Sequence, residues 1–460
     1  MLSFFQITSV QEVIPVPSKR IYRRSKIKDV TLESLKSIAE IKGSEGVRVG
    51  LDIAKKEIVV VVRWEDGSFE RPWSVANPSE ISVLVELLCG LKRLCGGLTV
   101  GLESTGTYGD SVRFALNQAE IEVHRVSGKG VSDYKEIFDG VPSQHDGKDA
   151  AMIAELTHYG KGTPWPYEVR SESEQHLRRY VARLDSFRDQ GIQWIGRLEA
   201  MLARHWPELI EHVQVSSSTV LNICVTYGSP AELAADGSAR QQLRRWGGPR
   251  LRSKKIDAII DSAKNTAGIP MGSGEKAWLQ DIGQQVVKAR EEVRDCEKKL
   301  SAIVKSSKEM QGYEGKIGVV TLCVIWSIAG NPANYSSSGA FLKALGLNLK
   351  EISSGKRNGR LAISKRGSGL VRKYLFLWAM RVCSHPSLKD WYTNFQRVGR
   401  SQTGDSDYRK MKALVALMRK LARGLWYCCK HDLPFEYAKV FPGKPLQPRR
   451  KRRSRRRVAV

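Results

Sequence analysis

Arg48-Val49-Gly50-Leu51-Asp52-Ile53 is a short apolar run with an acid near its end, and Leu98-Thr99-Val100-Gly101-Leu102-Glu103 repeats that pattern further along the chain. Runs of this length and composition predict buried strands. The β-branched run from Glu57 to Trp64 follows the first strand and closes on Asp66-Gly67, which predicts a hairpin. We therefore expect an α/β domain in which Asp52 and Glu103 lie at the ends of two strands.

A third segment adds two more acids. His145-Asp146-Gly147-Lys148-Asp149 leads into Ala150 to Leu156, a stretch that predicts the start of a helix. The three-residue interval between Asp146 and Asp149 places both side chains on one face of that helix. We expect Asp52, Glu103, Asp146 and Asp149 to converge.

Four converging carboxylates indicate a metal site, because they repel one another and are costly to desolvate without cations. Oxygen ligands alone favour Mg²⁺ or Mn²⁺, and no His or Cys set competes with them. Two such ions roughly 3.5–4 Å apart can stabilise the attacking and leaving oxygens of a phosphodiester. Taken singly, each acid is better explained as an ordinary helix cap or a surface charge. Only their joint order, strand, strand and helix, favours the metal site.

These motifs resemble the DEDD transposases of bacterial insertion sequences, a transposase and recombinase family related to the Piv DNA invertase. The matching segments are Gly50 to Ile53, Leu102 to Tyr108, and Asp146 to Ala150, and Gln144-His145 replaces the family's usual residues before Asp146. The resemblance implies a RuvC-like, RNase H-like α/β domain and a separate, mostly α C-terminal transposase domain. It spans roughly residues 47 to 430.

The C-terminal half is similar to that family's second signature. Gly346-Leu347, Ser353-Ser354-Gly355, Ile363 to Gly367 and Leu370-Val371-Arg372 follow in its order. The resemblance implies that Ser354 is a nucleophile, with Ser353 as the fallback, and a serine hydroxyl needs a base or metal to activate it. Without the resemblance, Ser-Ser-Gly is an ordinary polar turn. The cations expected to bind nucleic-acid phosphate are Lys356, Arg357, Arg360, Lys365, Arg366 and Arg372.

The charge of the chain fits a nucleic-acid enzyme. Its 75 Lys and Arg against 48 Asp and Glu give a net charge of +27, which favours encounter with polyphosphates and strong salt dependence. No apolar stretch approaches the roughly 18 residues of a membrane span, and a secretion pattern is absent from the N-terminus. Eight scattered cysteines lack Cys-x-x-Cys spacing and are expected to be reduced. We expect a cytoplasmic, nucleoid-associated bacterial protein.

We expect five segments along the chain. Residues 1–45 are a basic extension without an assigned role, 46–165 the catalytic domain, 170–310 a helical region, 311–435 the transposase domain and 436–460 a basic tail. The tail composition suits a nucleic-acid contact and leaves a nuclear-localisation signal open. The loop Arg244 to Lys255 suits nucleic acid and a solvated surface equally. A coiled-coil seam, within one chain or between chains, is predicted by apolar residues at steps of mostly four and three: Trp278, Ile282, Val286, Ala289, Val293, Cys296, Leu300 and Ile303.

The predicted function is Mg²⁺-dependent DNA strand cleavage and exchange through a transient phosphoserine. The resemblance further implies a noncoding bridge RNA that pairs with target and donor DNA, and synapsis of two DNA sites implies a tetramer made of dimers. Two other classes stay open. A metal-dependent junction resolvase or nuclease would use the acids without Ser354, and a non-catalytic nucleic-acid-binding protein would need neither.

Overall fold

The computed structural model describes residues 23–104, 106–140, 145–354, 357–398 and 406–442. The chain divides into two compact units, Met1–Val169 and Arg170–Val460, and each is described by itself. Within the described ranges, no helix is both long and apolar enough to cross a membrane. All eight cysteines are free thiols.

The first unit is built on a mixed seven-stranded sheet in the order β1-β4-β3-β2-β5-β6-β7. The pairs β2/β3 and β3/β4 are antiparallel, whereas β2/β5 and β5/β6 are parallel. This mixed α/β arrangement is compatible with the RNase H-like domain expected from the sequence. The strands are β1 (Ser25–Lys26), β2 (Arg48–Ile53), β3 (Glu57–Arg63), β4 (Trp73–Ala76), β5 (Thr99–Glu103), β6 (Glu122–Val126) and β7 (Thr163–Pro164).

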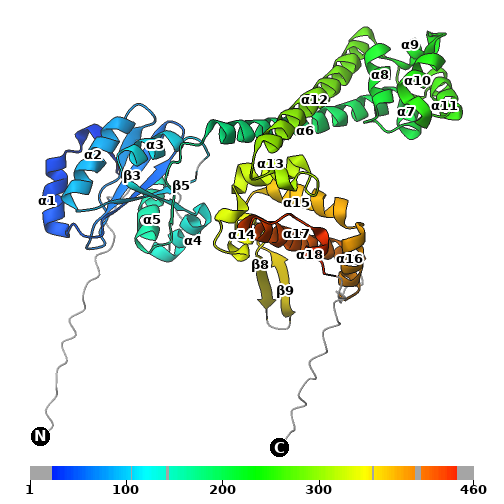
Figure 1. The fold of residues 1–460 in the computed structure, drawn as a ribbon. Helices are drawn as coiled ribbons and strands as arrows, with labels where there is room; N and C mark the ends of the chain where they lie inside the picture. The colour runs from blue at the N-terminus through cyan, green and yellow to red at the C-terminus, as the bar shows by residue number, and fades with distance from the viewer. Residues whose placement is uncertain (1–22, 105, 141–144, 355–356, 399–405, 443–460) are drawn as a thin grey trace, which may run out of the picture. The chain divides into compact units, whose positions relative to one another are not determined.

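Helices cover both faces of this sheet because the interior strand β3 is apolar on both sides (Figure 1). Ile58, Val60 and Val62 pack in a core with α1 (Leu32–Lys42), α2 (Ile81–Leu94) and α3 (Asp110–Gln118). The alternate residues Val59 and Val61 pack on the other face, with α4 (Gly128–Asp139) and α5 (Asp146–His158). The sheet is therefore the middle of three layers.

Residues 23–45, expected to be an extension, are part of this unit. Ile27 in the 3-10 helix η2 (Ile27–Asp29) and Leu35 in α1 are both buried in its core. Strand β1 pairs in parallel with β4 at the sheet edge. The apolar face of α1 accounts for its docking on α2, and Thr31 caps the helix by accepting a hydrogen bond from the Ser34 amide.

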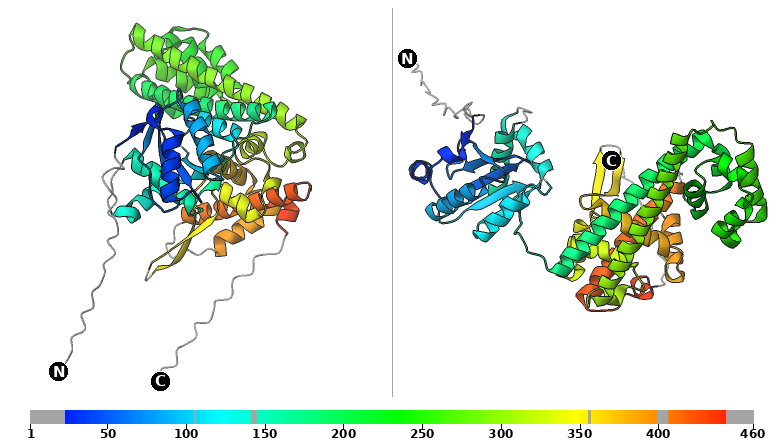
Figure 2. Two further views of the ribbon diagram at one scale, coloured as in Figure 1. Left: turned by 90° about the vertical axis from the view of Figure 1, so that its left-hand side faces the viewer. Right: turned by 90° about the horizontal axis from the view of Figure 1, so that it is seen from above.

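The second unit contains two 34-residue helices, α6 (Glu172–His205) and α12 (Ser273–Ser306), which lie side by side (Figures 1 and 2). The N-terminal part of α6 packs with the C-terminal part of α12, through Leu184 and Leu300. Their other ends meet through Leu202 and Ile282, so the helices are antiparallel. The apolar repeat of α12 thus faces a helix of the same chain, and a coiled coil between chains stays a prediction.

Five short helices connect α6 to α12 and enclose a core of their own around Trp206 and Leu243. Ser217 and Ser229 cap two of them by accepting backbone amide hydrogen bonds. These helices are α7 (Pro207–His212), α8 (Ser218–Thr226), α9 (Pro230–Ala235), α10 (Ala239–Gly247) and α11 (Ser253–Lys264), with the 3-10 turn η3 (Gly248–Arg250) between the last two.

The C-terminal part of the second unit is mostly helical, with one antiparallel hairpin, β8 (Leu349–Ser354) and β9 (Arg357–Ile363). Its core reaches into the predicted tail, because Tyr437 and Phe441 are buried against Trp378 and its neighbours. The remaining elements are η4 (Gln311–Tyr313), α13 (Val319–Ala329), η5 (Pro332–Asn334), α14 (Ser338–Ala344), α15 (Gly369–Val382), α16 (Pro386–Val398), α17 (Ser406–Lys430) and α18 (Tyr437–Val440).

Candidate active site

Two glycines let helix α5 lie close to the sheet. Gly50 of β2 is paired with Gly101 of β5, and α5 crosses over both. A Cβ atom on Gly50 would collide with the carbonyl oxygen of Ala150, and one on Gly101 would collide with the Thr157 hydroxyl. The absence of both side chains therefore sets the distance between helix and strands.

The acids Asp52 and Glu103 follow these glycines by two residues, so they lie on the same face of the sheet as α5. The pKa of Asp52 is raised to about 6, mainly by burial and also by the nearby charges of Asp146 and Glu103. The ammonium of Lys135 acts in the opposite direction. Because the charges of Asp146 and Glu103 act on Asp52, one acid of α5 and the two strand acids lie within electrostatic range of one another.

The start of α5 positions the remaining two acids. His145 is the N-cap residue, and its Nδ1 accepts a hydrogen bond of 3.1 Å from the Gly147 amide. Asp146 and Asp149 occupy the first helical turn, where the helix dipole favours negative charge. The residue that departs from the family motif thus has a structural role, because it caps the helix that carries both acids.

Each acid of α5 is paired with a side-chain cation. Asp149 forms an ion pair with Lys135 of α4, and both side chains are largely buried. Asp146 accepts a hydrogen bond of 2.6 Å from Arg24, in the segment before β1. Glu103 packs against the start of α4, where a Cβ on Gly128 would collide with its carboxylate. Two of the four acids are therefore paired with a cation, and one of these cations, Arg24, is shared with Glu57.

The donor set suits a hard divalent cation, since all four groups offer carboxylate oxygens and retain a net negative charge. Among the residues that the structure describes, no three His, Cys, Asp or Glu side chains are arranged to hold a metal ion. Asp146 and Asp149 are instead paired with side-chain cations. The four residues fit Mg²⁺ or Mn²⁺ in donor type and charge.

Ser354 lies at the last position of β8, near the tip of the hairpin (Figure 1). It is paired with Arg357 of β9, and the register shifts between Ile352 and Ser354. Ser353 precedes it on the same strand. Gly355 and Lys356 lie outside the described residues, and Arg357 and Arg360 are placed only by their backbone in β9.

The rest of the C-terminal signature meets at the base of this hairpin. Gly367, with φ of 143°, lies against the carbonyl oxygen of Ala344 and the amide of Gly346. Arg372 donates a hydrogen bond of 2.8 Å to the Gly367 carbonyl. A contact between Ser364 and Asn348 joins the same two segments. We call Gly346, Gly367 and Arg372 the glycine clasp, and Lys365 and Arg366 are exposed beside it.

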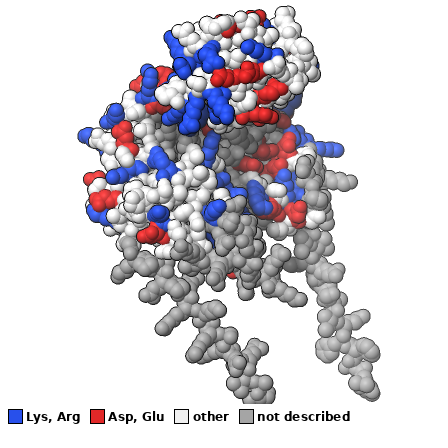
Figure 3. Space-filling view, turned by 90° about the vertical axis from the view of Figure 1, so that its right-hand side faces the viewer, with Lys and Arg blue, Asp and Glu red and all other residues white. Residues whose placement is uncertain are grey.

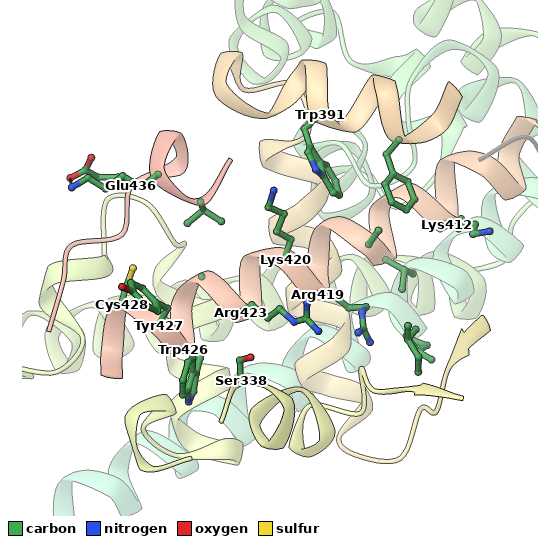
Figure 4. Close-up of a pocket in the computed structure, with 18 of the residues that line it drawn as sticks. Ser338, Trp391, Lys412, Arg419, Lys420, Arg423, Trp426, Tyr427, Cys428 and Glu436 are labelled. Atoms are coloured by element: carbon green, nitrogen blue, oxygen red, sulfur yellow. Dashed lines mark hydrogen bonds and ion pairs between the residues drawn. The ribbon is translucent and has the colours of Figure 1, made fainter. Parts of the chain in front are cut away.

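A groove of about 920 Å³ runs along α17 beside the hairpin (Figure 4). Leu349 and Leu361 of the hairpin form part of its lining and are about half exposed. Aromatic and cationic side chains complete it. The ammonium of Lys420 lies 5.1 Å from the centre of the Trp391 ring, and burial lowers the pKa of Lys420. The other labelled members are Ser338, Lys412, Arg419, Arg423, Trp426, Tyr427, Cys428 and Glu436.

Elsewhere the charged surface is mixed. On the face shown in Figure 3, Lys and Arg lie among Asp and Glu rather than in one continuous basic surface. The loop Arg244 to Lys255 forms the end of α10, η3 and the start of α11, and Arg244, Arg245 and Lys254 are exposed there. The net charge alone therefore does not locate a nucleic-acid surface.

Several functional candidates were not predicted from the sequence. Arg24 and Lys135 reach the acids from distant segments, and nothing in their local sequence marks them. The groove along α17 also depends on tertiary packing. The paired glycines had a signal, because Val-Gly-Leu precedes the acid in both β2 and β5.

Comparisons with known proteins agree with these two regions. A family model described as Transposase, for the DEDD transposases of IS110 elements, matches residues 49–207 and includes all four acids. A model described as Transposase IS116/IS110/IS902 family matches residues 314–393, which include Ser354 and the glycine clasp. No curated protein matches the chain. The chain belongs to the IS110-type DEDD transposases, which are DNA-processing enzymes of insertion sequences.

Proposed function

We propose that this transposase cleaves and exchanges DNA strands in a Mg²⁺-dependent reaction with Ser354 as nucleophile. The observation that carries the proposal is the gathering of the acids around Asp52, whose pKa rises through burial and through the charges of Asp146 and Glu103. Such a cluster favours a bound divalent cation. The cation would act on the DNA phosphate at this domain. The two matched family regions then supply the acids and the serine in one chain.

The serine step conserves phosphodiester energy. The Ser354 Oγ attacks a DNA phosphorus, a new O–P bond forms, and one P–O bond to deoxyribose breaks. The serine proton passes to a base, and the leaving deoxyribose oxygen takes up a proton. A deoxyribose hydroxyl of the exchanged strand then attacks the phosphoserine and frees Ser354. No external energy is needed, which distinguishes this route from hydrolysis.

Asp52, Glu103, Asp146 and Asp149 are the residues that would hold the cation. When bound, a divalent cation polarises phosphate oxygens and lowers the pKa of the attacking or leaving hydroxyl. The chain contributes the geometry. The glycines under α5 fix the helix that carries Asp146 and Asp149, and His145 caps it.

On the C-terminal side, the hairpin and its surroundings are proposed to hold the nucleic acid. Lys365 and Arg366 are exposed next to the glycine clasp, and Arg419, Lys420 and Arg423 line the groove beside β8 and β9. Cations neutralise phosphate, and aromatic rings such as Trp391 stack with unpaired bases. Arg372 is better suited to bracing the clasp than to binding phosphate, because it is already bonded to Gly367.

A recombination assay tests this proposal. Cells carrying the native element with its flanks on one plasmid and a target on another would be scored for new junctions by sequencing. Asp52→Asn and Ser354→Ala should each reduce junctions to background, and Ser353→Ala should retain them. Exchange that persists in Ser354→Ala but is lost in Asp52→Asn would contradict the serine mechanism, and DNA cleavage without joining would favour a nuclease.

We also propose that an element-encoded bridge RNA selects the DNA and that a tetramer of dimers performs synapsis. The resemblance to the family supports the guide RNA, and the need to hold two DNA sites together supports the tetramer. The chain expressed with its flanking noncoding DNA would be purified, treated with nuclease, and its retained nucleic acid sequenced. A discrete RNA from the element flank supports guidance. Only heterogeneous nucleic acid, or none, would contradict it, and light scattering of the same sample reports the assembly.

A further inference from the structure

The segment before β1 is fixed to the catalytic domain next to the acids. The Ser25 amide donates a hydrogen bond of 2.9 Å to the Pro72 carbonyl, and the Arg71 side chain donates one of 3.1 Å to the Arg23 carbonyl. Two residues after Ser25, Ile27 is 1% exposed in the core. Arg24 is therefore held between anchored neighbours.

The Arg24 side chain joins two carboxylates. One nitrogen lies 2.8 Å from Glu57 Oε2 and the other lies 2.6 Å from Asp146 Oδ2, so the guanidinium uses both arms. Glu57 is itself held by the hydroxyl of Ser74. Such charge-assisted bonds are stronger than neutral ones, and the planar guanidinium fixes their direction. Glu57 is not among the four acids of the motif, whereas Asp146 is.

The guanidinium lies 2.6 Å from Oδ2 of Asp146, so a divalent cation that binds this carboxylate meets a positive charge already placed on it, and the two cations repel each other. We propose that Arg24 is a built-in counter-ion of Asp146, which holds the acid cluster together without metal and which a divalent cation must displace. This inference rests on the proposed function, since it takes Asp146 to be a metal ligand. It gives the N-terminal segment a role in the active site as a positioning element.

Glu57 is the second partner of Arg24, and this partner would hold the side chain after its displacement from Asp146. Because the contact to Glu57 does not involve a motif acid, the loss of the contact with Asp146 would leave the Arg24–Glu57 ion pair available. The divalent cation would thus replace the positive charge of Arg24 at Asp146, while the Arg24 side chain stays next to the site. Lys135 on Asp149 is a second cation of this kind, but it lies on α4 and is not part of the N-terminal segment.

The affinity of the full-length protein for Mn²⁺ tests this inference, measured by the electron paramagnetic resonance signal of free Mn²⁺. Arg24→Gln removes the competing cation and should tighten binding about three- to tenfold, the range expected for losing one charged contact that is partly exposed. Arg24→Lys keeps the charge but not the two-armed contact and should fall between. Thermal unfolding of each variant checks that the segment still docks.

Lys28→Gln is the matched control, because Lys28 lies on the same segment and pairs with Glu80 at 3.1 Å. It should leave the Mn²⁺ affinity within about 1.5-fold, which separates contact from net charge. In an Asp146→Asn background, Arg24→Gln should have no further effect. If Arg24→Gln matches wild type while Asp146→Asn weakens binding, the counter-ion role is wrong and the metal site stands. If wild type and Arg24→Gln both fail to bind Mn²⁺, the proposed metal site is wrong as well.

Discussion

At the scale of single residues, the acids of this protein are defined by their neighbours. Burial raises the pKa of Asp52, and the nearby charges of Asp146 and Glu103 add to this effect, so that its pKa reaches about 6. Asp146 and Asp149 are instead paired with Arg24 and Lys135. Cations of the chain thus partly neutralise the acid cluster. The remaining repulsion between carboxylates is felt at Asp52, whose pKa it raises.

Asp52→Asn should therefore stabilise the metal-free protein at neutral pH. The pKa of Asp52 is raised in the folded state, so its protonated form folds better. That stabilisation is complete below about pH 4 and is lost as the pH rises through about 6. Urea unfolding with chelator should show the variant about 1–2 kcal/mol more stable than wild type at pH 7.5, with the difference gone near pH 4. Equal stability at both pH values would contradict the assigned environment.

At the scale of secondary-structure elements, the catalytic domain depends on how closely α5 approaches β2 and β5. The glycines Gly50 and Gly101 make that approach, and the buried ion pair between Arg63 and Glu155 holds the same helix on β3. The acids at the N-terminus of α5 are brought to the sheet by this packing rather than by their own contacts. A shift of α5 would therefore change the geometry of the site.

Gly50→Ala should disturb both the packing of α5 on the sheet and the geometry of the acid site. The new Cβ meets the backbone of Ala150, which cannot move without shifting α5, and such overpacking costs about 1–3 kcal/mol. The midpoint of chemical denaturation should fall, and the affinity for Mn²⁺ should decrease. Gly97→Ala is the control, because a Cβ there meets nothing within 4 Å. Loss of stability without any loss of Mn²⁺ affinity would contradict the link between helix position and site.

The glycine clasp makes a similar prediction for the second unit. Gly367→Ala places a Cβ against the Ala344 carbonyl at a φ of 143°, a backbone conformation that side chains avoid. Recombination should fall at least tenfold because the hairpin with Ser354 loses its base, while Mn²⁺ binding stays unchanged. Gly369→Ala, whose Cβ comes no closer than 3.9 Å to Arg372, should recombine normally. Equal activity of the two variants would argue against the clasp.

The sequence predicted the parts of the site that repeat a local pattern. The strands of Asp52 and Glu103 follow from two apolar runs and the helix of Asp146 from the helix-like stretch after it, and the structure has β2, β5 and α5 there. Arg24 and Lys135 could not be predicted, because their positions arise from sheet edge pairing and helix packing. The hairpin of β8 and β9 was not predicted, because the residues around Ser353-Ser354-Gly355 show no strand pattern.

At the scale of the whole molecule, the chain combines two units that contain different parts of the proposed site. The first holds the four acids, and the second holds the long helices α6 and α12, the hairpin and the groove. Residues 208–313 lie between the two family matches and include the helices α8 to α11. The excess of positive charge belongs to the full chain, with eight Lys and Arg between Arg449 and Arg457.

Removing residues 449–457 should weaken nucleic-acid binding without removing chemistry. Eight phosphate contacts at most would be lost, so the slope of log affinity against log salt should become shallower by up to roughly 7 for duplex DNA. Fluorescence anisotropy over a salt series measures this change. Recombination at low salt should be retained within a few-fold. An unchanged slope would show that the tail makes no phosphate contact.

The covalent link between protein and DNA tests the central claim most directly. The full-length protein would be incubated with labelled element-end DNA, its co-purified nucleic acid and Mg²⁺, then denatured, digested with protease and nuclease, and analysed by mass spectrometry. The account predicts a nucleotide on Ser354 that requires Mg²⁺, disappears in Ser354→Ala and Asp52→Asn, and persists in Ser353→Ala. Cleaved DNA with free ends and no adduct, produced equally by Ser354→Ala, would contradict it.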